Sequence, residues 1–365
     1  DEGKGLNLCL KIRFSDRLRG GESNIKSKEQ GVPYFFLINN IKVILIFLVV
    51  FNHIIAFQLV KVNPAVRQLW YAITVFHMPA FIFVSGFLSK SKQNVLKNIQ
   101  NLLVPYILGY SFTWAVKVWL GYNMDYDILR PSGTVMWYVL ALFVYRLIIE
   151  AFGRIRFIVP LSIIFSLWAG TRNEFSTYLS ASRIVVFFPF FVAGYLWKSQ
   201  YITVLRNFRR KWILMSLTLI LLYLMTAYML GNNLPVDIFR GNHSYRASNI
   251  SEMEGMLIRL FTYLASFLMI ISLLAIIPDR NLFLTFIGSG RRTMGIYFFH
   301  YPMQIAMNSF QILKIPLLLN VGSLFLISLL MVLILGSVPV NWAYNHVLRL
   351  INIMFFKEKA WCTDE

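Results

Sequence analysis

The fold is decided by residues 35–57, which read FFLINNIKVILIFLVVFNHIIAF. This stretch is almost wholly apolar and is long enough to cross a bilayer as one helix. It still contains Lys42 and, eleven residues later, His53. A spacing of eleven is three helical turns plus about 20°, so the two side chains share one face, roughly 16 Å apart along the axis. Because ionisable groups inside a spanning helix are costly and usually face a protein interior or a cavity, this helix is predicted to line a functional site.

The overall composition is typical of a helical membrane protein. Of the 365 residues, 58% are hydrophobic and 14% are charged, and the mean hydropathy of +0.62 lies outside the range of soluble proteins. We attribute the net charge of +19 to membrane orientation and contact with anionic lipids, and we expect no nucleic-acid partner. Cys9 and Cys362 lie in the terminal tails, and no Cys or His cluster has metal-ligand spacing, so no metal site is predicted.

Apolar segments recur along nearly the whole chain. They predict an all-α fold, a polytopic membrane protein with about ten transmembrane helices in one bundle. The expected spans are 35–58, 69–89, 102–120, 134–150, 157–171, 184–198, 212–230, 257–277, 293–311 and 317–340. In this plan residues 34–341 form the transmembrane domain, 1–33 a basic and disordered cytoplasmic tail, and 342–365 a second cytoplasmic tail.

The distribution of Lys and Arg orients these spans. With the amino terminus inside, 24 of the 35 Lys and Arg residues fall in inner segments and nine in outer segments. This asymmetry predicts a multi-pass protein of the plasma membrane with both termini in the cytoplasm. The long polar outer segment 231–256 is open to two interpretations, a cover over a site or a solvated connection.

Five polar features interrupt the apolar background. They are His53 in the first span, His77 in the second, the pair Trp137 and Tyr138 in the fourth, Arg183 at the sixth, and His300 in the ninth with Tyr297 on the same face. Each has a structural alternative as well. A membrane histidine can simply bond a neighbouring helix, a Trp–Tyr pair can belong to an aromatic belt, and a Lys or Arg near a helix end can reach the interface.

The residue types that are missing narrow the function. The predicted spans hold no internal Asp or Glu, which disfavours an ion-coupled carrier that relays protons through buried carboxylates. No G-x-S-x-G motif and no P-loop are present. Histidines, cations and aromatic rings remain, and these suit transfer from a phosphate-bearing donor to an alcohol.

At these residues the chain resembles acyltransferase family 3, the membrane O-acyltransferases of bacterial surface polysaccharides, and within it the fucose 4-O-acetylase-like branch. The family pattern of a basic residue, ten residues and a histidine is similar to Lys42 and His53 in NNIKVILIFLVVFNH. Four further stretches resemble the family in order, namely FHMPAFIFVSGF (76–87), MWYVLAL (136–142), SRIVVFFPFFVAGY (182–195) and RRTMGIYFFH (291–300). The sequence departs from the family where Lys42 replaces the more frequent arginine and Asn52 the more frequent glycine.

The resemblance implies an O-acetyltransferase that uses cytoplasmic acetyl-CoA, or another acyl-CoA, as co-substrate with no permanently bound cofactor. The acceptor would be a hydroxyl of a cell-surface or lipid-linked glycan. His53 would act as general base in direct transfer, and the alternative of a covalent acyl-histidine intermediate stays open. Lys42 would steady the CoA or orient the site. His77 or His300 would donate to the oxyanion, and the side chains expected to bind donor or acceptor are Trp137, Tyr138, Arg183, Tyr297 and His300.

Two alternatives from other classes stay open. One is an acyltransferase remnant that acts as a scaffold, which no sequence feature supports or excludes. The other, a transporter of lipid-linked glycan or polysaccharide, would also suit ten helices, many aromatic residues and a basic inner face. It predicts transport without consumption of acetyl-CoA, and function that survives replacement of His53.

Overall fold

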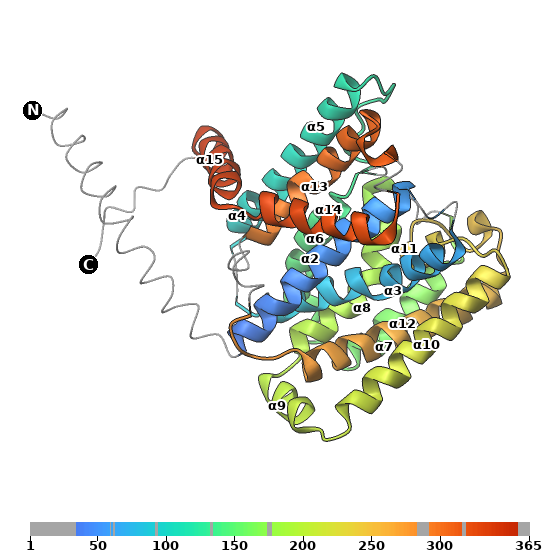
Figure 1. Cartoon of the computed structure of the whole chain (residues 1–365). Helices are drawn as coiled ribbons and strands as arrows, with labels where there is room; N and C mark the ends of the chain where they lie inside the picture. The colour runs from blue at the N-terminus through green and yellow to red at the C-terminus, as the bar shows by residue number, and fades with distance from the viewer. Residues whose placement is uncertain are drawn as a thin grey trace, which may run out of the picture.

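All regular secondary structure in the described part of the chain is helical (Figure 1). The computed structural model describes residues 34–356 except 59, 61–62, 92–93, 132–133, 174–176, 283–291 and 316–318. The larger helices are α2 (Phe35–Gln58), α3 (Pro64–Phe87), α5 (Val104–Trp119), α6 (Trp137–Phe152), α7 (Ile158–Ala169), α8 (Ala181–Leu196), α9 (Ser199–Asn207), α10 (Lys211–Gly231), α12 (Glu252–Ile276), α13 (Arg292–Ser309), α14 (Val321–Leu335) and α15 (Val338–Phe355). Short helical pieces are α4 (Val95–Asn98), η1 (Ile99–Leu103), η2 (Tyr178–Ser180), α11 (Asp237–Arg240), η3 (Arg246–Ser248) and η5 (Ile312–Lys314).

The predicted spans coincide with helices, which confirms the all-α membrane fold. Each of the ten apolar segments overlaps one helix, from α2 for 35–58 to α14 for 317–340. Among the described residues, five helices are long and apolar enough to cross a membrane alone, namely α2, α3, α8 together with η2, α10 and α12. α14 and α15 form a sixth candidate that is bent by 55°. The count of about ten spans therefore stays a prediction.

Helices α2, α3 and α8 form the centre of the bundle, with α10 and α12 along one side (Figure 1). The backbones of α3 and α8 approach closely because each helix has a glycine against the backbone of the other. A Cβ atom built on Gly86 would lie 2.1 Å from the carbonyl oxygen of Phe191, and one built on Gly194 would lie 1.9 Å from that of Phe83. Small residues permit such packing in membranes, where apolar side chains alone give little preference for a partner helix.

α3 continues through Pro79 without ending. The proline has no N–H, so the carbonyl of Val75 one turn earlier loses its helical donor. The Ser266 hydroxyl of α12 donates a hydrogen bond to that carbonyl, with the two oxygens 2.8 Å apart. A neighbouring helix thus satisfies the freed backbone group, as a membrane interior requires.

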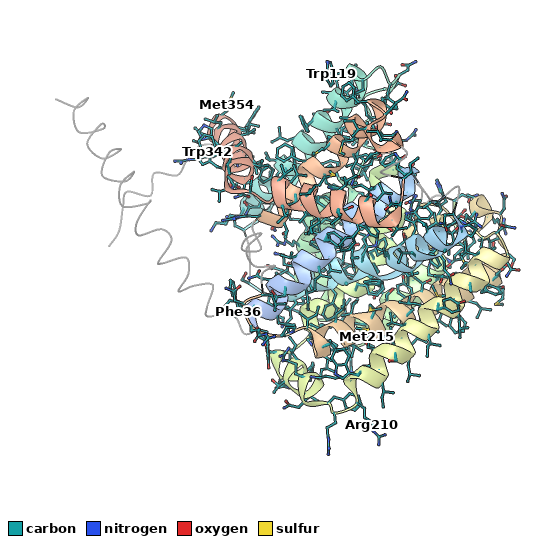
Figure 2. The ribbon with its side chains drawn as sticks, in the orientation of Figure 1. Phe36, Trp119, Arg210, Met215, Trp342 and Met354 are labelled. Atoms are coloured by element: carbon teal, nitrogen blue, oxygen red, sulfur yellow. The ribbon has the colours of Figure 1, made fainter. Side chains whose placement is uncertain are left out.

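Large apolar side chains cover much of the outside of the bundle. On α10, Leu217 and Leu224 are exposed, and Trp342 and Met354 project from α15 at the edge of the molecule (Figure 2). Arg210 marks the charged end of α10 in the same view. An apolar exterior with charges at helix ends fits contact with lipid.

The two expected tails differ in outcome. Residues 1–33 lie outside the described residues. The described part of the second tail, from residue 342, is helical and belongs to α15, which has Pro339 in its first turn and packs against α13 and α14; its cytoplasmic location stays a prediction. The pattern of Trp342, Val347 and Leu350 outward and Tyr344 inward is amphipathic, which explains why this segment is a helix without being apolar throughout.

Packing and hydrogen bonds hold the outer segment 231–256 against the helix bundle. Its helix α11 packs on α3 and α12. The backbone N–H of Tyr245 donates to the carbonyl of Gly170 at 2.8 Å, and the buried guanidinium of Arg259 lies 4.6 Å above the Tyr245 ring. Arg259 also donates to the carbonyl of Ser166 at 3.0 Å. These contacts favour the first of the two interpretations, a cover held in place.

Candidate active site

A cavity of about 400 Å³ lies where α2, α3, α6, α8, α11 and α13 meet. Its walls combine imidazole, guanidinium, amide and aromatic groups. The polar and aromatic residues that line it are Asn52, His53, Trp70, Thr74, His77, Thr134, Trp137, Arg183, Arg240, Asn242, Tyr297 and Tyr301. Five different helices therefore bring together five residues expected from the sequence, namely His53, His77, Trp137, Arg183 and Tyr297.

His53 is half-buried on α2, lines the cavity and lies next to α13. Its ring centroid lies 5.6 Å from that of His300 and 5.5 Å from that of Tyr301. Within the described residues, no group donates a hydrogen bond to either ring nitrogen of His53 or accepts one from it. The imidazole is therefore free to exchange a proton with a bound molecule.

His300 is completely buried directly behind His53. Its Nδ1 lies 2.7 Å from the carbonyl oxygen of Tyr297, and since a carbonyl only accepts, Nδ1 carries the proton and donates. Its Nε2 is then an acceptor, and it has no hydrogen-bond partner among the described residues. His300 does not itself line the 400 Å³ cavity.

His77 has the same tautomer for the same reason. It lines the cavity from α3, and its Nδ1 donates to the carbonyl of Ile73 at 2.7 Å. In the neutral ring this leaves Nε2 as an acceptor. Neither His77 nor His300 can donate to an oxyanion in this state, which disagrees with the role expected for them from the sequence.

Arg183 enters the cavity from α8 and is positioned by two contacts. Its guanidinium carbon lies 4.8 Å above the Trp137 ring, and its Nε donates to Oδ1 of Asn242. Trp137 in turn stacks on Phe187, with ring centroids 5.2 Å apart. The guanidinium is thus fixed against an aromatic face inside the cavity.

Arg240 and Asn242 from the outer segment were missed by the sequence analysis as individual residues. The guanidinium carbon of Arg240 lies 4.9 Å above the Trp70 ring, and its Nη1 is 3.8 Å from Oδ1 of Asp237. Burial lowers the pKa of Arg240 and Asp237 opposes the shift. Gly241, between Arg240 and Asn242, has φ of 62°, a left-handed conformation that glycine adopts without strain. The side chains on either side of this glycine both line the cavity.

Besides His300, two more expected residues, Lys42 and Tyr138, lie outside the cavity. Lys42 is half-buried on α2, three turns from His53 toward the start of the helix. Tyr138 is buried beneath the wall, where its hydroxyl lies 2.7 Å from that of Ser85 and its ring 5.3 Å from that of Tyr297. Tyr297 lines the cavity and bonds the Val135 carbonyl through its hydroxyl. Tyr138 therefore supports a lining residue.

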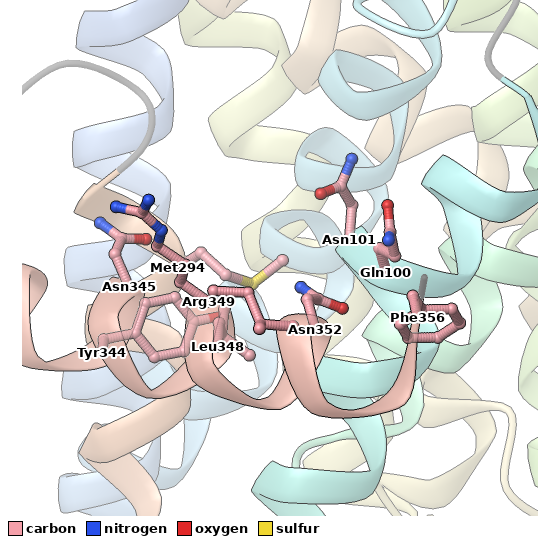
Figure 3. A pocket seen from close by; sticks show the side chains of 10 residues that line it. Gln100, Asn101, Met294, Tyr344, Asn345, Leu348, Arg349, Asn352 and Phe356 are labelled. Atoms are coloured by element: carbon pink, nitrogen blue, oxygen red, sulfur yellow. The ribbon is translucent and has the colours of Figure 1, made fainter. Parts of the chain in front are cut away.

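A second cavity, of about 500 Å³, lies between α15, η1 and the start of α13. Figure 3 shows Asn345, Arg349 and Asn352 along α15, with Gln100 and Asn101 opposite them on η1. The buried Oδ1 of Asn352 has no hydrogen-bond partner in the described part of the chain. Met294 of α13 lines this cavity and Tyr297, one helical turn further along the same helix, lines the first.

In the part of the chain that the structure describes, no three His, Cys, Asp or Glu side chains gather as a metal-binding group. The arrangement is that of a helical membrane protein with an unbonded histidine in a cavity of cations and aromatic rings. Residues 35–342 match the model of a protein family described as an acyltransferase domain, and the chain belongs to this family, acyltransferase family 3. No curated protein and no solved structure matches the chain. The fold and the family together make the protein a membrane acyltransferase.

Proposed function

We propose that the protein moves an acetyl group from acetyl-CoA to a hydroxyl of a cell-surface or lipid-linked glycan. The observation that carries this proposal is the imidazole of His53, which has no hydrogen-bond partner among the described residues and lines a cavity with arginine and tryptophan side chains. Histidine exchanges protons near neutral pH, arginine holds anionic groups, and tryptophan provides a flat face for a sugar ring.

His53 acts as the general base in this proposal. It removes the proton of the glycan hydroxyl, and the oxygen attacks the thioester carbon of acetyl-CoA. The carbon–sulfur bond then breaks, the imidazolium returns the proton to the sulfur, and the products are the glycan ester and free CoA. General acid–base catalysis of this kind contributes typically 10²–10⁴-fold to a rate.

Tyr301 is the oxyanion donor in this proposal, because His77 and His300 have no N–H on the open ring nitrogen in their neutral tautomer. Its ring is 5.5 Å from that of His53, it lines the same cavity, and a phenol can donate a hydrogen bond while it stays neutral. The His300 ring lies 5.6 Å from the His53 ring, and its acceptor Nε2 has no hydrogen-bond partner among the described residues. It is suited to orient the His53 ring as a positioning residue.

The donor is proposed to enter through the second cavity. This cavity lies at the end of α13 that follows the predicted inner segment 279–292, and Arg349 with several amide side chains can contact phosphate and adenine groups there. Met294 and Tyr297 are about 4.5 Å apart along the axis of α13, so the two cavities adjoin along one helix. A thin pantetheine arm would follow this helix from the second cavity toward His53.

The test follows release of free thiol from acetyl-CoA by the purified full-length protein in nanodiscs, with and without a pool of cell-surface glycan precursors. We expect release that the glycans stimulate and that the His53→Ala variant lacks. The variant His346→Ala serves as control, because His346 lies on α15 stacked against Trp342, away from the cavity. Absence of CoA binding and of thiol release in the wild type would contradict the proposal and favour the transporter.

A further inference from the structure

We propose that the acceptor glycan is acidic, and that Arg183 and Arg240 bind its carboxylate or phosphate group at the outer end of the cavity. This inference rests on the proposed function, because it names the class of acceptor for the same site. It is based on the excess of positive charge around the cavity and on the contacts that hold the two guanidinium groups.

The two arginines are held mainly by aromatic rings and an amide. Arg183 lies over Trp137 and bonds Asn242, and Arg240 lies over Trp70. Stacking on a ring leaves the edge of a guanidinium, with its terminal N–H groups, open to a ligand. Both side chains are half-buried and line the same cavity as His53.

The charges in the cavity do not balance. Among the described residues, Asp237 is the carboxylate within ion-pair distance of these arginines, at 3.8 Å from Nη1 of Arg240. Asp237 also accepts a hydrogen bond from Nδ2 of Asn242 at 3.4 Å. One carboxylate beside two guanidinium groups leaves a net positive charge in a partly dehydrated space. Such a charge is costly until an anion neutralises it.

The surrounding groups suit an acidic sugar in particular. Guanidinium forks bind carboxylate and phosphate groups through paired hydrogen bonds, and the Trp70 and Trp137 rings line the same cavity for contact with a sugar face. An anion held by Arg183 and Arg240 would place a neighbouring hydroxyl of the same glycan in the space that His53 faces. The arginines thereby determine which hydroxyl reaches the base.

The acceptor and the donor are both anionic, so the source of the bound charge has to be identified. Arg240 and Asn242 belong to the connection between α10 and α12, on the predicted outer side, whereas Arg349 lies at the second cavity. Binding of the acceptor to Arg240 and of CoA to Arg349 is the assignment that the two cavities support.

The experiment measures binding to the full-length protein in nanodiscs by titration calorimetry. The probes are tri-galacturonate, its neutral methyl ester, glucose 1-phosphate, glucose and CoA. We expect at least one acidic sugar to bind about tenfold or more tightly than its neutral counterpart, since bonds to a charged group are the strong ones. Arg240→Gln should abolish this preference and leave the affinity for CoA unchanged.

Arg246→Gln is the matched control, because Arg246 lies in the same outer segment, exposed and paired with Glu252 at 2.6 Å. It should keep the full preference. Equal binding of both acid–neutral pairs to the wild type would overturn the inference, as would an Arg240→Gln variant that loses CoA in place of the acidic sugar. Binding can be measured without acetyl transfer, so the two claims can fail separately. A preference for acidic sugars without thiol release would reject only the proposed function. Acetyl transfer to neutral glycans and not to acidic ones would reject only this inference.

Discussion

At the scale of the residue, the three membrane histidines differ in what their ring nitrogens contact. His77 and His300 each commit Nδ1 to a backbone carbonyl of their own helix, whereas the His53 ring bonds no group in the described part of the chain. A committed Nδ1 fixes the tautomer and the ring orientation. His53 is therefore the histidine with both ring nitrogens open to a bound molecule.

The Ser266 hydroxyl gives a prediction at this scale. It satisfies the Val75 carbonyl that Pro79 leaves without a donor, so Ser266→Ala should lower the free energy of unfolding by about 1 kcal/mol. Thermal unfolding in detergent, followed by circular dichroism, measures the change. The double variant Pro79→Ala with Ser266→Ala restores a backbone donor and should lose less than the single variant. An equal loss of unfolding free energy in the single and the double variant would show that the Ser266 hydroxyl does not stabilise the helix by bonding the Val75 carbonyl.

The residues themselves show what the sequence could predict about the site. His53, His77, Trp137 and Arg183 stood out because each is polar or aromatic within an apolar segment, and all four line the cavity. Arg240 gave no such signal, because an arginine in a polar loop is ordinary. Its position depends on the docking of α11 against α3 and α12, a tertiary contact without a local pattern.

At the scale of the element, the pair α3 and α8 determines the position of the cavity, since His77 comes from one helix and Arg183 from the other. Their close approach depends on glycines rather than on the apolar residues that mark both helices as membrane segments. The sequence predicted both helices to within a few residues because long apolar runs have a strong pattern. Which helices pack together depends on surface shape, which that pattern does not encode.

Gly194→Ala tests this packing. The added methyl group would meet the Phe83 carbonyl, a backbone atom that cannot rotate away, so the helices must separate. Overpacking costs typically 1–3 kcal/mol, and we expect a melting temperature lower by about 5 °C or more, with loss of thiol release. Gly231→Ala is the control, since nothing lies within 4 Å of a Cβ atom there. Equal melting temperatures for the two variants would show that the glycine contact is unimportant.

α15 shows the limit of a hydropathy criterion at this scale. Its polar face, with Asn345, Arg349 and Asn352, lines the second cavity, and its apolar face is exposed. Such a helix is amphipathic and so resembles a tail when only long apolar runs are counted. It is recognised when apolar residues are counted at helical spacing.

Arg349→Gln tests the role of this helix. Under the proposed function it should raise the KM for acetyl-CoA by about tenfold, because a charge-assisted contact to phosphate is lost, while kcat changes little. His346→Ala, on the same helix, should leave both constants unchanged. Steady-state thiol release at varied acetyl-CoA measures them. A change in kcat alone would place Arg349 outside donor binding.

At the scale of the whole molecule, the assignment of donor and acceptor to the two cavities requires the end of the bundle with α11 to face outward. We expect Asn233→Cys, in the outer segment, to react with a membrane-impermeant maleimide in sealed right-side-out vesicles, and Gln200→Cys, on α9, to react only after permeabilisation. Both cysteine variants are made in a chain in which serine replaces Cys9 and Cys362. The reverse pattern of labelling would invert the predicted orientation and the assignment of donor and acceptor to the two cavities.

The proposal that the protein transfers an acetyl group from CoA to a glycan, with His53 as general base, is tested by following the label of radioactive acetyl-CoA into glycan with protein in nanodiscs. We expect a base-labile glycan ester with the wild type and with His346→Ala. We expect at least 100-fold less product with His53→Ala, the loss typical when a general base is removed. Wild-type levels of labelled glycan with His53→Ala would contradict the proposal.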